Sequence, residues 1–405
     1  MDTLSHSLAG IAFADAAVGG RDNSVPRRPF LLAGILASNA ANLDNLYAAI
    51  TPASLGYLLH HRGHTHTLIG SAVLAAGIAA GFALVPSVRR LPPASRARLW
   101  TVIACAAFSH LVFDLMNVNG LHPFYPFDSR WVFGDAAFTF EPWLWATLGV
   151  SAGLNARSRL GRWRLLTVMA AASTGLALLG LIAPEALAAV YAIGAASAWT
   201  LRDSSPRVRA LFALTATAGV LLALVGFSRV AGARVTAALA PVMTEAQIDN
   251  ILMPDPGLPL CWTFIVVGSD ARAGELVHYR GSLSLAPWWR RAVECPSHRI
   301  MNPPTSTPLG GDGAVLTGVV RQPLAQLKEA ARKDCFVRAW LQFGRVPVID
   351  NGTIRDLRFD GLLRENFSVM RLADSNRGCP PFMTRWPSPR TAGRADAQPP
   401  AANRR

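Results

Sequence analysis

The sequence predicts a polytopic α-helical membrane domain of about six to eight helices, followed by a C-terminal soluble α+β domain. Of its 405 residues 51% are apolar and only 16% are charged, which is unusual for a soluble protein of this length. Several apolar runs approach the roughly 20 residues that a membrane-spanning helix needs. After about residue 250 the pattern changes to β-branched and aromatic segments, which are typical of strands.

The apolar runs define the expected membrane domain. Two weaker segments, 4–18 and 30–50, come first, and polar residues interrupt both. Runs nearer to spanning length follow at 68–88, 99–117, 141–156, 165–183, 186–200 and 208–227. We therefore expect a membrane domain over residues 1–232, an α+β domain over 233–385 and a disordered Pro/Arg/Ala-rich tail over 386–405.

The arginines indicate how the chain is oriented. Arginine-rich loops stand at "RRLPPASRAR" (89–98), "RSRLGRWR" (157–164) and "RDSSPRVR" (202–209). Each lies two crossings from the next, so positive-inside bias puts all of them in the cytoplasm. Residues 51–66, 117–140 and everything after about 235 are then extracytoplasmic, in a multi-pass membrane protein. Because the net charge of +14 is spread over these loops, the lipid bilayer is the expected partner and nucleic acid is not.

The expected outer domain is described by its strands and its cysteines. Strand-like segments are "CWTFIVVGSD", "ELVHYRGSLSLAP", "AVLTGVVRQP" and "CFVRAWLQFGRVPVID", and "PLAQLKEAARK" (323–333) indicates a short helix. The domain contains Cys261, Cys295, Cys335 and Cys379, whereas Cys105 lies in an apolar run. Outside the cytoplasm four cysteines allow two disulfides with three possible connectivities, and four buried thiols are the alternative.

Ionisable residues gather at the outer side of the expected membrane domain. His110 and Asp114, spaced i and i+4 in the run 99–117, share one helix face, and Asn117 extends it. Charged groups inside a bilayer are energetically unfavourable, so they mark a functional site by default. The alternative is a His–Asp pair that only holds helices together.

Three more segments bring polar residues to the same level. His6 lies four positions after Asp2, Asp44 ends the segment "SNAANLDNL" (38–46), and "HHRGHTH" (60–66) precedes the run 68–88. We expect Thr65 or Thr67 to cap the helix that follows.

The loop 117–145 carries further candidates. Asp135 and Glu141 can serve as catalytic residues, outer partners of a metal site or solvated charges, and Asn117 and Arg130 are candidates for substrate binding. Arg62 is suited to hold a phosphate or carboxylate through two hydrogen bonds. Nitrogen and oxygen donors without a nearby cysteine suit zinc, manganese or iron, and six or more candidates suffice for two metal ions.

The motifs "MDTLSHSLAG", "ANLD", "HHRGHTH" and "SHLVFDLMNVNG…PF", in this order, resemble the YdjM-like family of bacterial inner-membrane proteins, whose members are named as metal-dependent hydrolases. The resemblance covers roughly the first 145 residues, and the longer members are similar through the later spans and the C-terminal domain. It implies metal binding by His6, Asp44, His61, His66, His110 and Asp114.

Two positions depart from the family pattern. Asn42 stands where the family usually has an aspartate, which removes a charge from the expected site. Glu141 stands where the family tends to have aspartate. By the same resemblance His60 and His64 lie outside the motif, and we expect them to be incidental and exposed.

The sequence therefore predicts a membrane-bound hydrolase that uses a divalent metal, with zinc favoured and manganese or iron as alternatives. Its substrate would be an ester or phosphoester, small or lipid-linked, with Arg62, Asp135 and Glu141 as catalytic residues and Asp114 or Asp135 as general base. The competing hypothesis is a non-catalytic membrane protein, either an ion or proton transporter or one with a structural metal site. The polar cluster lies near one surface and the sequence has no internal repeat, which favours the hydrolase over a transporter.

Overall fold

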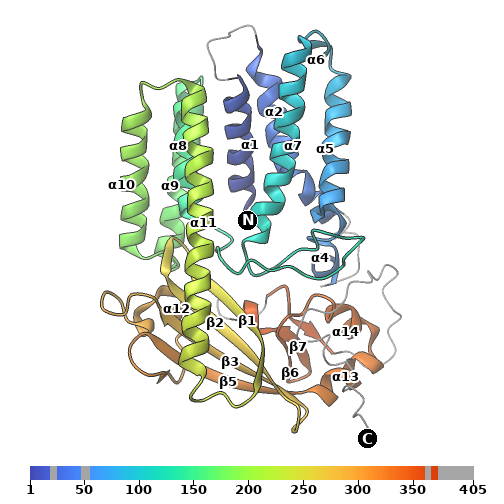
Figure 1. Ribbon diagram of the computed structural model, residues 1–405, viewed down its shortest axis with the longest axis vertical. Coiled ribbons are helices and arrows are strands. Elements are labelled where there is room, and N and C mark those ends of the chain that lie inside the picture. Colours follow the sequence, from blue (N-terminus) through green and yellow to red (C-terminus); the bar gives the residue numbers. More distant parts are fainter. Residues whose placement is uncertain (19–24, 47–54, 361–365, 373–405) are drawn as a thin grey trace, which may run out of the picture.

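The computed structural model describes residues 1–18, 25–46, 55–360 and 366–372. It has two layers stacked along the long axis, a helical bundle and a sheet-rich layer beneath it in the view of Figure 1. A mostly helical N-terminal region and a C-terminal sheet-rich domain are thus confirmed. The expected tail at 386–405 and Cys379 lie outside the described residues.

Each apolar run of the sequence contains a helix. The long helices of the bundle are α1 (Thr3–Val18), α2 (Arg27–Asn39), α5 (Leu68–Ala83), α7 (Pro93–Leu115), α8 (Pro142–Leu154), α9 (Arg159–Leu178), α10 (Pro184–Leu201) and α11 (Pro206–Leu239). Shorter elements between them are η1 (Ala40–Leu43), α4 (Leu55–His60), η2 (His64–His66) and α6 (Pro86–Arg89). Proline begins α7, α8, α10 and α11, a position where its missing N–H would have had no helical partner.

The expected count of six to eight membrane-spanning helices is not confirmed. Among the described helices, α7 and α11 are long and apolar enough to cross a membrane, and α5 is apolar but shorter. The segment 30–50 does not form one span, because α2 ends at Asn39 and the 3₁₀ turn η1 follows. The helix of the run 68–88 ends at Ala83, since Pro86 begins the separate helix α6.

Close packing of α1 on α2 fixes where the two helices cross. A Cβ atom at Gly10 would lie 2.3 Å from the carbonyl oxygen of Gly34, so glycine is needed where the two backbones cross. On its other side α1 packs Leu8 against Leu144 and Leu148 of α8. The α1 helix is therefore held from two sides.

The C-terminal domain contains two antiparallel sheets. The first has strands β1 (Ala246–Asp255), β2 (Leu258–Asp270), β3 (Glu275–Ser284), β5 (Ala314–Pro323) and β4 (Thr307–Pro308), in the order β1-β2-β3-β5-β4. The second has β6 (Pro347–Asp350), β7 (Thr353–Asp356) and β8 (Met370–Arg371). Between the strands lie η3 (Ala292–Glu294), α12 (Pro296–Met301), α13 (Leu324–Lys333), α14 (Cys335–Trp340) and η4 (Leu357–Phe359).

Most of the expected elements of this domain are confirmed, and one is wrong. The three segments that contain β2, β3 and β5 form strands, and α13 is the helix expected at 323–333. The segment 335–350 is not one strand, because Asp334 accepts a hydrogen bond of 2.8 Å from the N–H of Phe336 and so begins α14. Its strand is only β6. Cys261 and Cys295 form a disulfide, one of the pairings that the sequence left open.

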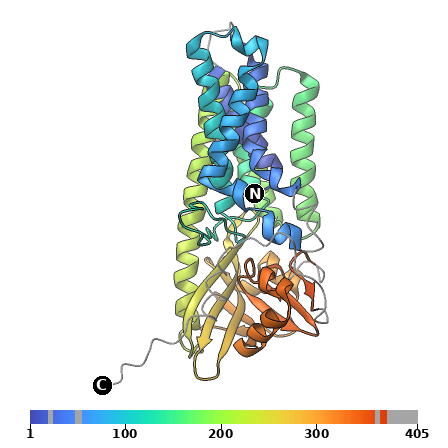
Figure 2. The same cartoon turned by 90° about the vertical axis from the view of Figure 1, so that its right-hand side faces the viewer.

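Helix α11 joins the two layers. It runs the length of the bundle and continues along the sheet, as Figures 1 and 2 show. In its last turns Val235 and Leu239 pack with Trp262 and Phe264 of β2. The domain boundary expected at residue 232 thus lies inside this helix. The sheet-rich domain is held against the end of the bundle where α1 begins and α7 ends (Figure 1).

Candidate metal centre

The first turn of α1 positions His6. The carboxylate of Asp2 accepts hydrogen bonds from the N–H and the hydroxyl of Ser5, at 2.9 and 2.7 Å, and so caps the helix. The indole N–H of Trp145 in α8 donates to the Ser5 hydroxyl at 3.0 Å. The next residue, His6, is buried, and its ring stacks on that of His110 with 3.8 Å between centroids.

Helix α7 contributes His110 and Asp114, one turn apart on one face as their spacing predicts. Nδ1 of His110 lies 2.7 Å from the carbonyl oxygen of Ser38, and its Nε2 lies 3.6 Å from the Asp114 carboxylate. Asp114 also contacts Nε2 of His6 at 3.3 Å and the amino group of Met1. His6, His110 and Asp114 form a buried group whose ligand atoms all lie within 4.8 Å of one another.

A second group forms around Asp44, which follows η1. Its carboxylate lies 3.2 Å from Nδ1 of His61 and 2.9 Å from Nδ1 of His66. It also accepts hydrogen bonds from the N–H of Arg62 at 2.8 Å and from the hydroxyl of Thr65 at 3.1 Å. The "HHRGHTH" loop is therefore folded around one buried carboxylate. The ligand atoms of Asp44, His61 and His66 again lie within 4.8 Å of one another.

His66 connects the two groups. Its Nε2 lies 3.3 Å from the Asp114 carboxylate and 3.1 Å from Nε2 of His110. Thr67 fixes the position of the loop, because its hydroxyl accepts the N–H of Gly70 and caps α5, one of the two caps that the sequence predicted. We call the six residues the His/Asp cluster: His6, Asp44, His61, His66, His110 and Asp114. They are the same six that the resemblance implied as metal ligands.

The donor set of the His/Asp cluster fits a divalent metal ion. It provides four imidazoles and two carboxylates, all from residues with little or no solvent exposure. His6 directs Nε2 at Asp114, and its Nδ1 is buried without a hydrogen-bond partner within the described residues, so the ring is not fully satisfied by the protein. Nitrogen and oxygen donors without a cysteine are typical of zinc, manganese and iron sites.

Arg62 and Asn117 lie beside the cluster, as predicted. Nη2 of Arg62 is 3.3 Å from the Asp114 carboxylate, and Nη1 donates to the side-chain oxygen of Asn117 at 2.6 Å. Arg62 has a backbone φ of 65°, an uncommon value for a residue other than glycine. Within the described residues, Nε of Arg62 and the amide nitrogen of Asn117 are buried without a partner. Both therefore keep a donor that a ligand could use.

The three remaining predicted site residues lie outside the His/Asp cluster. Arg130 is exposed, and its guanidinium lies 2.6 Å from the Asp128 carboxylate. Asp135 accepts two hydrogen bonds of 2.8 Å from Arg345. Glu141 is buried where α8 begins, and burial raises its pKa to about 8, although the N–H groups of nearby residues favour the charged form. These positions give no support to a catalytic role for Asp135 or Glu141.

Arg345 links the bundle to the sheet-rich domain, and the sequence did not point to it. Its buried guanidinium binds Asp135 in the loop after α7 and Asp249 in β1, each at 2.8 Å. Although burial opposes the charge, the two carboxylates hold the pKa of Arg345 above its ordinary value. The guanidinium also lies 3.9 Å above the ring of Phe133. We call Arg345, Asp135 and Asp249 the Arg345 network.

Tyr57 is a second residue that sequence reasoning missed. Its ring stacks on His61 with 4.5 Å between centroids, and the i, i+4 spacing of the two residues at the end of α4 was the signal that could have revealed it. His60 and His64 lie outside the cluster, as expected. His64 is exposed, but His60 is buried, contrary to the expectation, because α4 turns it toward the protein interior.

A third group has metal-ligand spacing but different chemistry. Asp255, Cys261 and Cys295 lie close together in the sheet-rich domain. The two sulfur atoms are bonded to each other, so they are not thiolate ligands in this state.

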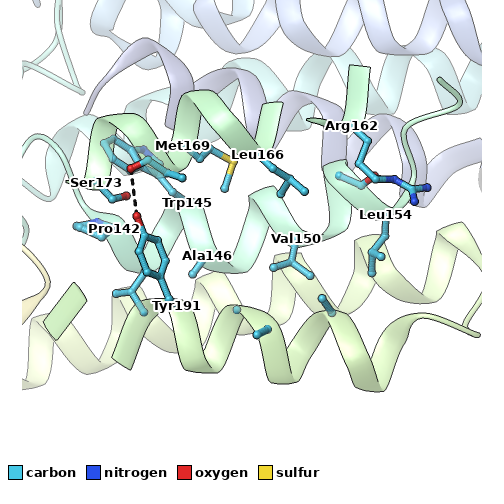
Figure 3. Close-up of a pocket in the computed structure, with 16 residues that line it drawn as sticks. Pro142, Trp145, Ala146, Val150, Leu154, Arg162, Leu166, Met169, Ser173 and Tyr191 are labelled. Atoms are coloured by element: carbon cyan, nitrogen blue, oxygen red, sulfur yellow. Dashed lines mark hydrogen bonds between the residues drawn. The ribbon is translucent and has the colours of Figure 1, made fainter. Parts of the chain in front are cut away.

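An apolar cavity of about 330 Å³ lies between α8, α9 and α10, away from the His/Asp cluster (Figure 3). Trp145, Met169 and Tyr191 are among its lining residues, and the Tyr191 hydroxyl donates to the carbonyl of Ala170 at 3.1 Å. None of the six cluster residues lines it. The cavity therefore offers packing for an apolar chain and no candidate ligands for a metal.

The part of the chain that contains the His/Asp cluster is similar to known proteins. Residues 1–186 match the family model described as YdjM inner membrane protein. The chain is also similar to the "Uncharacterized protein YfhP" of Bacillus subtilis (strain 168), with 28% identity over 151 residues. That similarity covers 36% of the chain and 43% of the relative, so the chain spans less than half of the relative's length. No solved structure matches the chain.

Proposed function

Since residues 1–186 match the family model described as YdjM inner membrane protein, we propose that the protein is a membrane-embedded, metal-dependent hydrolase. Its site would lie at the outer face of the inner membrane and act on an ester or phosphoester. The observation that carries this proposal is the His/Asp cluster, in which two groups of metal-ligand spacing meet at His66 and Asp114.

The choice of metal follows from the donors. Four imidazoles and two carboxylates favour zinc, with manganese or iron as alternatives. Two groups that meet in this way provide enough donors for two ions. When bound, a divalent cation there supplies Lewis acidity, which polarises an ester or phosphoryl oxygen and lowers the pKa of a neighbouring water.

The protein's own residues would bind and orient the substrate. Arg62 has two guanidinium nitrogens within 3.3 Å of Asp114 and Asn117, so it can hold an anionic oxygen at the edge of the cluster. The amide nitrogen of Asn117, buried without a partner within the described residues, can donate to a second substrate oxygen. The sheet-rich domain lies against this end of the bundle (Figure 1).

The strained backbone of Arg62 supports a functional role. A φ of 65° at a residue other than glycine is unfavourable by about 1–3 kcal/mol and persists only where its surroundings impose it. Here the Asp44 carboxylate accepts the N–H of Arg62 at 2.8 Å and imposes that conformation. The strain orients the guanidinium toward Asp114.

The proposed membrane orientation combines several spanning helices with an extracytoplasmic C-terminal domain. The arginine-rich loops between α5 and α7, α8 and α9, and α10 and α11 all lie at the bundle end far from the sheets (Figure 1). Positive-inside bias assigns that end to the cytoplasm. The Cys261–Cys295 disulfide supports the same orientation, because disulfides persist outside the reducing cytoplasm.

A structural role is the second candidate, and one observation favours it. The cluster's histidines and aspartates already contact one another, with His61 and His66 on Asp44 and His6 on Asp114. Such mutual pairing can hold α1, α2 and α7 together without catalysis.

The proposed activity is tested on the full chain, purified in detergent, stripped with a chelator and reloaded with zinc, manganese or iron. Chromogenic carboxylic esters and phosphate mono- and diesters serve as substrates. The proposal expects metal-dependent turnover that Asp114→Ala abolishes and that the exposed-histidine control His64→Ala retains. Metal binding without turnover of any ester or phosphoester would leave the structural role in its place.

A further inference from the structure

A cavity of about 500 Å³ lies between the bundle and the sheet-rich domain. Its walls come from the loop that follows α7, the end of β1, helix α12 and the segment around η4. The volume lies in the range of about 300–1,000 Å³ that is typical of ligand pockets. It is separate from the cavity of Figure 3, with which it shares no lining residue.

One end of this interdomain cavity comes within one residue of the His/Asp cluster. Tyr57 and Asn117 line it, and each contacts the cluster's immediate surroundings. The Tyr57 ring stacks on His61 at 4.5 Å, and Asn117 accepts a hydrogen bond of 2.6 Å from Arg62. A molecule in the cavity could therefore present a polar group to the cluster from this side.

Part of the remaining wall is aromatic. Phe138, Phe140, Phe359 and Phe367 line the cavity. Phe140 is 42% exposed and Phe367 is 39% exposed, although both lie on a concave surface. Large apolar side chains exposed together in a hollow mark a binding site for an apolar group.

The charges of the cavity argue against an anion deep inside it. Its arginine, Arg358, is neutralised by Asp356, with 2.8 Å between guanidinium and carboxylate. Asp255 and Asp360 add carboxylates to the lining. An anionic group would therefore be favoured only at the Asn117 end, where Arg62 lies, and an uncharged chain would be favoured elsewhere.

The cavity also adjoins apolar surface of the bundle. Leu181, in the turn between α9 and α10, lines it. Two residues just before this turn, Leu178 and Leu179, are 84% and 70% exposed. Exposed leucines at the bundle end fit a position at the membrane surface, from which an apolar chain can enter the cavity.

We propose that the interdomain cavity binds the apolar chain of an amphiphilic substrate, whose ester or phosphoester group lies at the Tyr57 and Asn117 end beside the His/Asp cluster. This inference rests on the proposed function, since it names the substrate class of that site. A lipid of the surrounding bilayer has this chemistry. A small polar substrate does not, because it has no apolar chain to pack against the four phenylalanines.

The test uses full-length protein in phosphatidylcholine nanodiscs and a probe that cannot be hydrolysed, an alkylphosphonate with a photoreactive diazirine in mid-chain. After illumination, the labelled peptides are identified by mass spectrometry. Unlabelled alkylphosphonates from hexyl to dodecyl compete with the probe. We expect labels on 137–140 and 357–360, and competition that strengthens about fourfold per added methylene until the cavity is filled.

Two variants and a matched control make the test specific. Thr139→Trp fills the cavity, and Phe140→Ala removes part of its aromatic wall. We expect each to reduce labelling at least tenfold while the melting temperature stays close to that of the wild type. Phe127, in the same loop, is 87% exposed and does not line the cavity, so Phe127→Ala should label normally.

The outcomes separate this inference from the proposed function. Labels spread over the lipid-facing helices, or competition that ignores chain length, would overturn the cavity proposal even if esters are hydrolysed. Specific, chain-length-dependent labelling would support the cavity proposal even if no hydrolysis is detected, in which case the proposed function fails alone.

Discussion

Nε2 of His66 lies 3.1 Å from Nε2 of His110, although the two residues are 44 positions apart in the chain. His66 belongs to the loop before α5, and His110 belongs to α7. The contact unites two groups of candidate ligands into one buried cluster. The predictions below test the cluster, the neighbouring Arg62 and the Arg345 network separately.

Replacing Arg345 with methionine should destabilise the fold without touching the cluster. Arg345→Met leaves the carboxylates of Asp135 and Asp249 buried without their cation. Breaking a buried pair in this way lowers the free energy of unfolding by about 3–5 kcal/mol. Thermal unfolding in detergent measures the change. The surface variant Arg332→Met, which also removes an ion pair, should melt like the wild type, and an equal loss in both variants would contradict a special role for the Arg345 network.

Glu141 should make stability depend on pH. Burial raises its pKa from 4.5 to about 8, so the folded state keeps a proton that the unfolded state releases. Between pH 4.5 and about 8 the free energy of unfolding therefore falls as pH rises, by up to ~1.4 kcal/mol per pH unit.

Glu141→Gln removes this dependence, since glutamine resembles the protonated acid. Wild type and variant should melt at similar temperatures near pH 4.5, and the variant should melt higher at pH 9. The surface variant Glu329→Gln is expected to keep the wild-type slope across this window. If the melting temperatures of the wild type and Glu141→Gln changed with pH in parallel, the buried carboxyl would not be protonated at neutral pH.

Arg62→Lys tests how the substrate is held. Lysine keeps the positive charge but loses the planar fork that reaches Asp114 and Asn117 together. A lost charge-assisted hydrogen bond of about 1.5–3 kcal/mol corresponds to a fall of roughly 10- to 100-fold in kcat/KM for a phosphoester. Metal content should not change. Loss of the metal in this variant would mean that Arg62 supports the cluster and does not act on the substrate.

The orientation of the sheet-rich domain can be read from its cysteines in living cells. Thiols are blocked with an alkylating reagent in intact cells before lysis, and peptides containing Cys261 and Cys295 are analysed by mass spectrometry. An extracytoplasmic domain should yield the disulfide-linked pair. Alkylation of both cysteines would instead indicate the reducing cytoplasm. Cys105, the free cysteine among the described residues, serves as the alkylation control.

Local rules predicted one pair of the candidate ligands and one helix cap, and the resemblance to the family supplied the rest. His110 and Asp114 share a helix face by spacing alone, and Thr67 caps α5 as hydroxyl residues do. That His6 and Asp44 belong to the same site as His110 and Asp114 was implied only by the ordered motifs of the family. No spacing rule relates α1 to α7.

The positions and partners of the other predicted site residues could not be predicted from the sequence. Asp135 finds its partner Arg345 at a separation of 210 residues, so its ion pair left no local signal. Glu141 is a buried acid beside a helix start, which in sequence looks like any solvated loop charge. The sequence predicts a strand in place of helix α14, because the aromatic and β-branched residues of this segment favour strands. In the structure the Asp334 side chain caps the segment and it forms a helix.

The central claim is that the His/Asp cluster binds metal, and elemental analysis of the purified full-length protein tests it most directly. The account predicts a stoichiometric divalent metal, zinc first, that is lost in His66→Ala and in His110→Ala. The same metal should remain in His64→Ala, whose exposed histidine lies two positions away in the same loop. Folded wild-type protein that holds no zinc, manganese or iron after reconstitution would contradict the claim, and so would equal metal content in all variants.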